Sequence, residues 1–262
     1  MRSDDTKRAL IVVRTYPVPV PLGIESSCTA AITESGDWLR LFPVPWRLLP
    51  SDQRFRKYQH VELRIRKAAD DARHESYNLS SDDAIRVLSE PLTSWREKKH
   101  YVMPLLSPSL CELARTRDAQ QYPTLGVFKP ASINRLRIAP LPPNWSDGEL
   151  GMLRQSHLFV ESPKQELEKI PFRFFYEFSC NDTACKGHNL MCTDWEMSES
   201  YRDWRIKYGE GGWEEKFRQR YEIEMVQKYD THFFVGTVAA HPNRWIIIGL
   251  FYPPPDLQAG LF

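Results

Sequence analysis

The chain has 262 residues, and its hydrophobic share of 42% and charged share of 26% are those of an ordinary globular protein, which excludes a fibrous or wholly disordered chain. No stretch approaches the roughly 20 consecutive apolar residues of a membrane-spanning helix, so we expect no membrane partner. The net charge is +1, but residues 1–140 hold 22 Lys and Arg against 16 Asp and Glu. This excess of positive charge indicates either a polyanionic partner or only a difference in polarity between the two halves of the chain.

The first 66 residues alternate β-rich segments with turn residues, in RALIVVRTY, CTAAIT, WLRLFPV and YQHVELRIRK. In HVELRIR the apolar Val61, Leu63 and Ile65 alternate with charged residues, which is the period of a half-buried strand. Pro and Gly separate the segments, as they do between strands. We therefore expect a small curved sheet or a β-barrel in this part of the chain.

Residues 68–145 have weaker patterns. We expect a loop and then a short helix that starts at the Ser-Ser-Asp-Asp run of residues 80–83. LCELARTRDAQ predicts a further helix, and TLGVFKP and SINRLRIAPLPP predict strands. The Pro-rich LPPNWSDGE then indicates a linker, which divides the chain into a basic β-rich lobe (1–143) and a second lobe (144–262).

The second lobe is predicted to mix helices and strands. A helix-prone stretch over 147–169 precedes the aromatic strand IPFRFFYEFSC. Two helices follow on either side of Gly209–Gly212, and the second carries Trp213, Phe217 and Tyr221 four residues apart on one face. HFFVGTVAAHPNRWIIIGLFYPP predicts a closing pair of strands. The fold class is α+β, with a barrel-like first lobe and a zinc-supported second lobe.

A Cys/His cluster follows the aromatic strand. CNDTACKGHNLMC spaces its candidate ligands as Cys180-x4-Cys185-x2-His188-x3-Cys192, with a glycine that lets the chain turn beside the histidine. Three thiolates and one imidazole form the closed tetrahedral set of a structural Zn²⁺ site. Reduced cysteines in a packed turn are the alternative, and Cys192 could equally be a buried cysteine. Clustered cysteines indicate metal binding in a reducing compartment, so we expect a cytoplasmic protein.

Aromatic and basic side chains are interleaved on the predicted strands of the first lobe. Small β-barrels bind single strands by stacking bases on aromatic rings and holding phosphates with arginines. The candidate nucleic-acid-binding residues are Trp38, Arg40, Trp46, Arg47, Lys57, Arg64 and Arg66. Large aromatics in a half-buried sheet also form cores, so packing is the alternative interpretation of the tryptophans.

Acidic residues gather in DDARHESY, where Asp70, Asp71 and Glu75 could hold a divalent ion for phosphodiester cleavage. No lysine and acid at recognisable spacing complete such a site, so we assign no catalytic residue. Asp194 and Glu196, directly after the cluster, are interpreted as partners of the metal ligands or as a charge pair at a helix N-terminus.

The runs SSCTAAITESGDWLRLFPVPWRLL, KYQHVELRIRKAADDARHESY and FFVGTVAAHPNRWIIIGLFYPP, with CKGH and the DWE after it, resemble a group of uncharacterised bacterial proteins. The first half also resembles the dual-OB-containing domain family of bacterial conflict and defence neighbourhoods. That resemblance implies paired OB-like barrels and nucleic-acid recognition, and it implies no catalytic residue. The second lobe departs from it, because a plain OB barrel has no such cysteine cluster or helices.

These patterns together predict a nucleic-acid-binding protein. We expect it to bind DNA or RNA in a larger protein complex, and the resemblance implies that it is the sensing component of a bacterial defence or mobile-element system. A metal-dependent nuclease that uses the acids of residues 70–75 is one alternative. An interaction scaffold whose Trp-rich helices dock another protein is the other.

Overall fold

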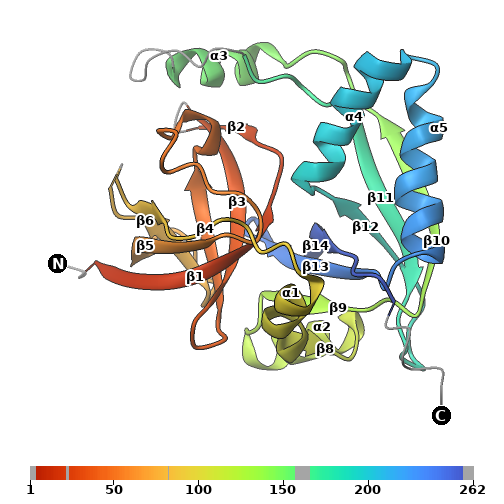
Figure 1. Cartoon of the computed structure of the whole chain (residues 1–262), viewed down its shortest axis with the longest axis horizontal. Helices are drawn as coiled ribbons and strands as arrows, with labels where there is room; N and C mark the ends of the chain where they lie inside the picture. Colours follow the sequence, from red (N-terminus) through yellow and green to blue (C-terminus); the bar gives the residue numbers. More distant parts are fainter. Residues whose placement is uncertain (1–3, 22–23, 82, 157–165, 256–262) are drawn as a thin grey trace.

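The chain forms two β-sheets that pack against each other, the first drawn in red to yellow and the second in green to blue (Figure 1). This computed structural model describes residues 4–21, 24–81, 83–156 and 166–255. Within these ranges no helix is both long and apolar enough to span a bilayer.

The first sheet closes into a five-stranded barrel. Its strands are β1 (Asp5–Arg14), β3 (Ile24–Thr33), β4 (Trp38–Val44), β6 (Ser76–Leu79) and β5 (His60–Lys67), in the order β1-β3-β4-β6-β5, and pairing of β1 with β5 closes the ring. The β4–β6 pairing is parallel. Val61, Leu63 and Ile65 are fully buried inside, as their alternation predicts. The barrel-like fold expected for the first lobe is confirmed.

Short strands extend the barrel: β2 (Val18–Val20) pairs with β3, and β7 (Ile85–Val87) pairs with β5. Strand β7 corrects the helix predicted to start at residues 80–83. Ile85 and Val87 lie opposite Leu63 and Val61. Pairing with β5 therefore outweighs the local sequence, which resembles the start of a helix. The 3₁₀ turn η1 (Trp46–Leu48) follows β4.

The second sheet has seven strands within the described ranges. In spatial order they are β10 (Ser132–Pro140), β11 (Phe172–Ser179), β12 (His188–Cys192), β14 (His241–Phe251), β13 (His232–Val238), β9 (Leu125–Phe128) and β8 (Leu106–Ser107). Strands β8, β9 and β10 therefore belong to the second sheet, although they precede the boundary predicted at residue 143. A Pro-rich linker is a local signal, whereas the sheet to which a strand belongs depends on distant partners.

Helices cover one face of the second sheet. They are α4 (Trp195–Tyr208), α5 (Trp213–Arg218), the π-helix η3 (Gln219–Glu224) and α6 (Met225–Gln227), and α4 and α5 stand beside β11 and β12 in Figure 1. Trp213, Phe217 and Tyr221 are buried, as the four-residue spacing predicts. The remaining helices are α1 (Trp95–Val102), η2 (Met103–Leu105), α2 (Leu110–Gln120) and α3 (Asp147–Ser156). Of the helical stretch predicted over 147–169, residues 147–156 form α3, residues 157–165 lie outside the described residues, and residues 166–169 are not helical.

The outer strand β10 has its backbone bonded by side chains from the helical layer. Arg218 Nη1 donates to the carbonyl of Leu136 at 2.8 Å, and the Leu136 N–H donates to Glu222 Oε1 at 3.0 Å. Arg218 and Glu222 also pair with each other at 2.9 Å. Both backbone groups of Leu136 are thus satisfied without a further strand.

The barrel packs on the opposite face of the second sheet through an apolar seam. Trp38 meets Phe234 edge to face, with ring centroids 6.1 Å apart, and Leu10 and Val13 of the barrel belong to the same buried cluster as Ile248. A side chain that faces outward from the barrel at β4 therefore lies in the interior of the molecule.

A buried polar network crosses this seam. Arg40, only 2% exposed, donates to the carbonyl of Thr124 at 2.8 Å and to its hydroxyl at 3.0 Å. Glu75 accepts from the Thr124 N–H at 2.7 Å, from its hydroxyl at 2.8 Å and from the Leu125 N–H at 3.2 Å. Gly236 makes room for the guanidinium, since a Cβ there would lie 3.2 Å from Arg40 Nη2. Burial lowers the pKa of Arg40.

Replacing Arg40 with Met should lower the free energy of unfolding by about 3–5 kcal/mol, because the Glu75 carboxylate and the Thr124 carbonyl would stay buried without their cationic partner. Chemical denaturation measures this loss. The matched control is Arg64→Met, which removes an exposed arginine paired with Asp83 and should cost under about 1 kcal/mol. Similar costs for the two variants would contradict the role of the network.

Candidate metal centre

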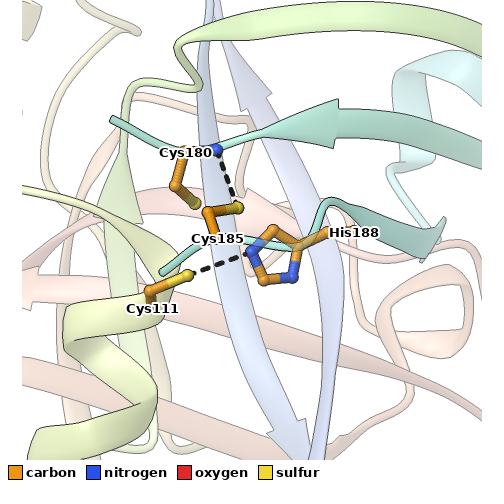
Figure 2. A group of neighbouring side chains, drawn as sticks. All are labelled: Cys111, Cys180, Cys185 and His188. Carbon is orange, nitrogen blue, oxygen red and sulfur yellow. Dashed lines mark hydrogen bonds between the residues drawn. The ribbon is translucent and has the colours of Figure 1, made fainter. Parts of the chain in front are cut away.

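Four metal-ligating side chains meet where α2 touches the β11–β12 hairpin (Figure 2). Cys180 follows the last residue of β11, Cys185 lies in the hairpin loop and His188 begins β12. Cys111 comes from the first turn of α2, which Ser109 caps by accepting from the Glu112 N–H. The group could hold a metal ion.

The ligand atoms already lie close to the arrangement of a tetrahedral site. All four are within 4.8 Å of one another, and Cys111 Sγ lies 3.3 Å from His188 Nε2. A tetrahedral ion with metal–sulfur bonds of about 2.3 Å would hold its sulfur ligands about 3.8 Å apart. A small contraction of the group would therefore close it around one ion.

Backbone N–H groups point at the sulfur atoms. Cys185 Sγ accepts from the N–H of Cys180 at 3.3 Å and from the N–H of Gly187 at 3.4 Å, and these bonds lower the pKa of the Cys185 thiol. Gly187 has φ +84°, a conformation that favours glycine and turns the loop around the sulfur, as the sequence predicts. Such bonds stabilise a thiolate, which is the form that binds metal.

The other ligands differ in their surroundings. His188 stacks on Phe178 with ring centroids 5.1 Å apart, and burial lowers its pKa, which favours the neutral imidazole that a metal requires. Burial raises the pKa of Cys111 to about 12. A bound cation would reverse that effect, because it stabilises the thiolate directly.

The structure changes one member of the predicted ligand set. Cys192 lies four residues beyond His188 on β12, and a strand advances about 3.3 Å per residue, so its sulfur is carried away from the group. It is 4% exposed in the core, where burial raises the pKa of its thiol. Cys111 replaces it. No spacing rule links Cys111 to ligands some 70 residues later; its position in the first turn of a predicted helix was the available signal.

An ion pair fixes α2 to the same hairpin. Arg115 lies 2.8 Å from Asp182 of the loop and 2.6 Å from Glu112 of its own helix. Asp182 also accepts from the Ala184 N–H at 2.9 Å. The helix and the loop are thus held together beside the cluster as well as through it.

All seven candidate nucleic-acid-binding residues have contacts within the protein, and five of them are buried or half-buried. Trp38 and Arg40 lie in the seam. The Trp46 indole donates to the Phe55 carbonyl at 2.7 Å, Arg47 pairs with Glu25 at 2.8 Å, and Lys57 donates to the Leu250 carbonyl at 2.9 Å and to Glu196 at 3.2 Å. Arg64 pairs with Asp83 and Arg66 donates to the Ser80 carbonyl at 3.5 Å, but both are exposed on β5.

The acidic candidates also have structural partners. Asp71 accepts from Arg73 at 2.5 Å, and Glu75 belongs to the seam network, while Asp70 is exposed. Asp194 is the N-cap of α4, accepting from the Met197 N–H at 3.1 Å, so the helix N-terminal interpretation of this residue is confirmed.

Cys111→Ser should abolish stoichiometric metal binding, because it removes a thiolate from the group, whereas Cys192→Ala should retain the metal. Elemental analysis of both purified variants checks this, with melting curves to confirm folding. The reverse result, metal kept by Cys111→Ser and lost by Cys192→Ala, would restore the ligand set predicted from sequence.

Two family models match the chain: Domain of unknown function (DUF8758) over residues 5–104, and Domain of unknown function (DUF8757) over residues 106–262. No curated protein matches it. A solved structure described as "Structure of murine DNA binding protein bound with ds DNA" aligns with 97% of this chain and 100% of its own, at 8% identity and a TM-score of 0.32, which is too low to relate the two molecules. Because the second model spans more than half of the sequence, the chain belongs to the DUF8757 family.

Proposed function

We propose that this protein binds nucleic acid along an open groove on its first half. The groove lies between the start of β5 and helix α1. It is lined by His60, Leu92, Ser94, Arg96, Glu97, Lys99, His100, Tyr101, Met103 and Pro104. This "α1 groove" carries the proposal, because it is a concave surface whose charged lining is mainly basic.

The lining combines the two kinds of contact that a polynucleotide needs. Arg96 and Lys99 can neutralise phosphates, and only Glu97 among the lining residues opposes them. Tyr101 packs edge to face against His60 and His100, with centroids 5.3 and 5.4 Å away. The cations can hold the backbone of a single strand or of a duplex, and flat rings beside them can stack on bases where a strand is unpaired.

Basic side chains continue from the groove along the outside of the barrel. Arg64 and Arg66 follow His60 on the outward face of β5. Arg8 and Arg86 flank the same strand, where Glu62 accepts from Arg8 at 3.1 Å and from Arg86 at 2.5 Å. The hydrogen bonds from Arg86 and Arg8 lower the pKa of Glu62, so this carboxylate stays charged and orients both guanidinium groups. A bound strand could leave the groove over these arginines.

The resemblance of the first half to dual-OB-containing domains supports the same proposal. It would make the protein the cytoplasmic recognition component of a larger complex in a bacterial defence or mobile-element system.

Arg96→Gln with Lys99→Gln should weaken binding of duplex DNA and reduce the slope of log affinity against log salt by about 1.8, because two phosphate contacts are lost. Fluorescence anisotropy at several salt concentrations measures both quantities. The control is Lys207→Gln with Lys216→Gln, which removes the same charge from exposed positions on α4 and α5. An unchanged slope in the folded groove variant would remove this surface from the proposal.

We propose zinc as the ion of the Cys111, Cys180, Cys185 and His188 group. Three thiolates and an imidazole match the ligand preference and tetrahedral geometry of a structural zinc site. Four protein ligands would leave no open position for substrate, so the ion would tie α2 to the hairpin rather than catalyse a reaction.

Purified protein should contain zinc equimolar with the chain, and a chelator should lower its melting temperature, because binding energy at a structural site is folding energy. Elemental analysis and a thermal melt with added EDTA check this. Metal-free protein that melts at the same temperature with and without added zinc would refute the proposal.

A further inference from the structure

We infer that the face of β10, β11 and β12 opposite the helical layer is a second contact surface, which takes single-stranded nucleic acid. The pairing register of β10 and β11 shows which residues lie on this face. Arg137 lies opposite Phe175, Ala139 opposite Arg173 and Arg135 opposite Glu177. Directly paired residues of antiparallel strands point to the same side of a sheet. Arg135, Arg137 and Arg173 therefore share one face with Phe175.

This face is opposite the helical layer. Phe174 and Tyr176, which alternate with Phe175, are buried in the core beneath α4 and α5. The barrel lies on the same side as Phe175 but packs against other strands, through residues such as Phe234 of β13 and Ile248 of β14. Arg135 and Arg173 are exposed, and Phe175 is half-buried.

The arginines of this face differ from those of the barrel in their partners. Arg8, Arg64 and Arg86 each pair with a carboxylate. Within the described part of the chain, no ion pair is formed by Arg135, Arg137 or Arg173. Glu177 is the only acidic residue in the three strands, so the face has a positive balance. Guanidinium groups without carboxylates attract an external polyanion.

A ring contact indicates which polyanion fits. The guanidinium carbon of Arg137 lies 3.9 Å from the centroid of the Phe175 ring. A guanidinium this close to an aromatic ring covers one ring face, and it can present its N–H edges to phosphate and its own outer face to a base. A duplex keeps its base faces stacked inside, whereas a single strand can present them. An acidic polypeptide would match the charge but would have no base to stack.

The inference rests on the proposed nucleic-acid function but uses residues remote in sequence from the α1 groove, so the two can fail separately. The variants are Arg135→Gln with Arg173→Gln, and Phe175→Leu, which keeps apolar bulk and removes the ring. The probes are an oligothymidylate and a duplex of equal length, and melting curves confirm folding.

The arginine variant should weaken oligothymidylate binding and reduce its salt slope by about 1.4, since single strands release about 0.7 counterion per contact. Phe175→Leu should weaken oligothymidylate binding about fivefold or more without changing the slope, because stacking is lost and charge is not. Duplex affinity should change little in Phe175→Leu. The Lys207→Gln and Lys216→Gln control should leave both probes unaffected.

Unchanged oligothymidylate affinity in both folded variants overturns this inference, and the proposed function stands if the groove variant still weakens duplex binding. If the wild-type protein binds neither probe, both are wrong. Polyglutamate of matched charge tests the alternative occupant. If it displaces the oligothymidylate, and Phe175→Leu does not change oligothymidylate affinity, the face binds acidic chains in general and the single-strand assignment is wrong.

Discussion

Seating of the barrel on the second sheet is the constraint on which the rest of the structure depends. Arg40 of the barrel is desolvated in the seam, and the Thr124 carbonyl and hydroxyl replace the water it loses. Glu75 supplies the compensating negative charge through the same threonine. Buried charges are costly unless they are hydrogen-bonded, so this network tolerates few relative positions of the two sheets. The apolar contact of Trp38 with Phe234 buries nonpolar surface between the sheets, and the polar network fixes their relative position.

That seating decides which surfaces remain for function. OB barrels commonly bind oligonucleotides on the face of their second and third strands. Here the corresponding strands are β3 and β4, and Trp38 and Arg40 of β4 face the second sheet instead of solvent. The candidate polyanion surfaces lie elsewhere: in the α1 groove, and on the face of β10, β11 and β12 opposite the helical layer. The metal cluster lies at the β11–β12 hairpin, where it would fix one end of that sheet.

Local patterns predicted the elements well, because the face that a side chain takes depends on its own strand or helix. Val61, Leu63 and Ile65 follow a two-residue period and Trp213, Phe217 and Tyr221 a four-residue spacing, and both groups are buried accordingly. The same patterns cannot show what covers a face, so Trp38 and Arg40 were candidates for nucleic-acid binding, with core packing as the alternative for the tryptophan. Cys111 was missed for a related reason: only the packing of α2 on a hairpin distant in sequence brings it to Cys180, Cys185 and His188. Cys192 was included because spacing along the chain does not reveal the rise of a strand.

The bonds from Arg218 and Glu222 to Leu136 limit how another polypeptide could join the second sheet. Strand addition requires free N–H and carbonyl groups along a sheet edge. At Leu136 both groups are taken by side chains of the helical layer. At the opposite edge β8 consists of two residues, which offer little length for pairing. These two features oppose the addition of a peptide strand to the second sheet, and stacking of molecules through β10 is opposed at its middle residue.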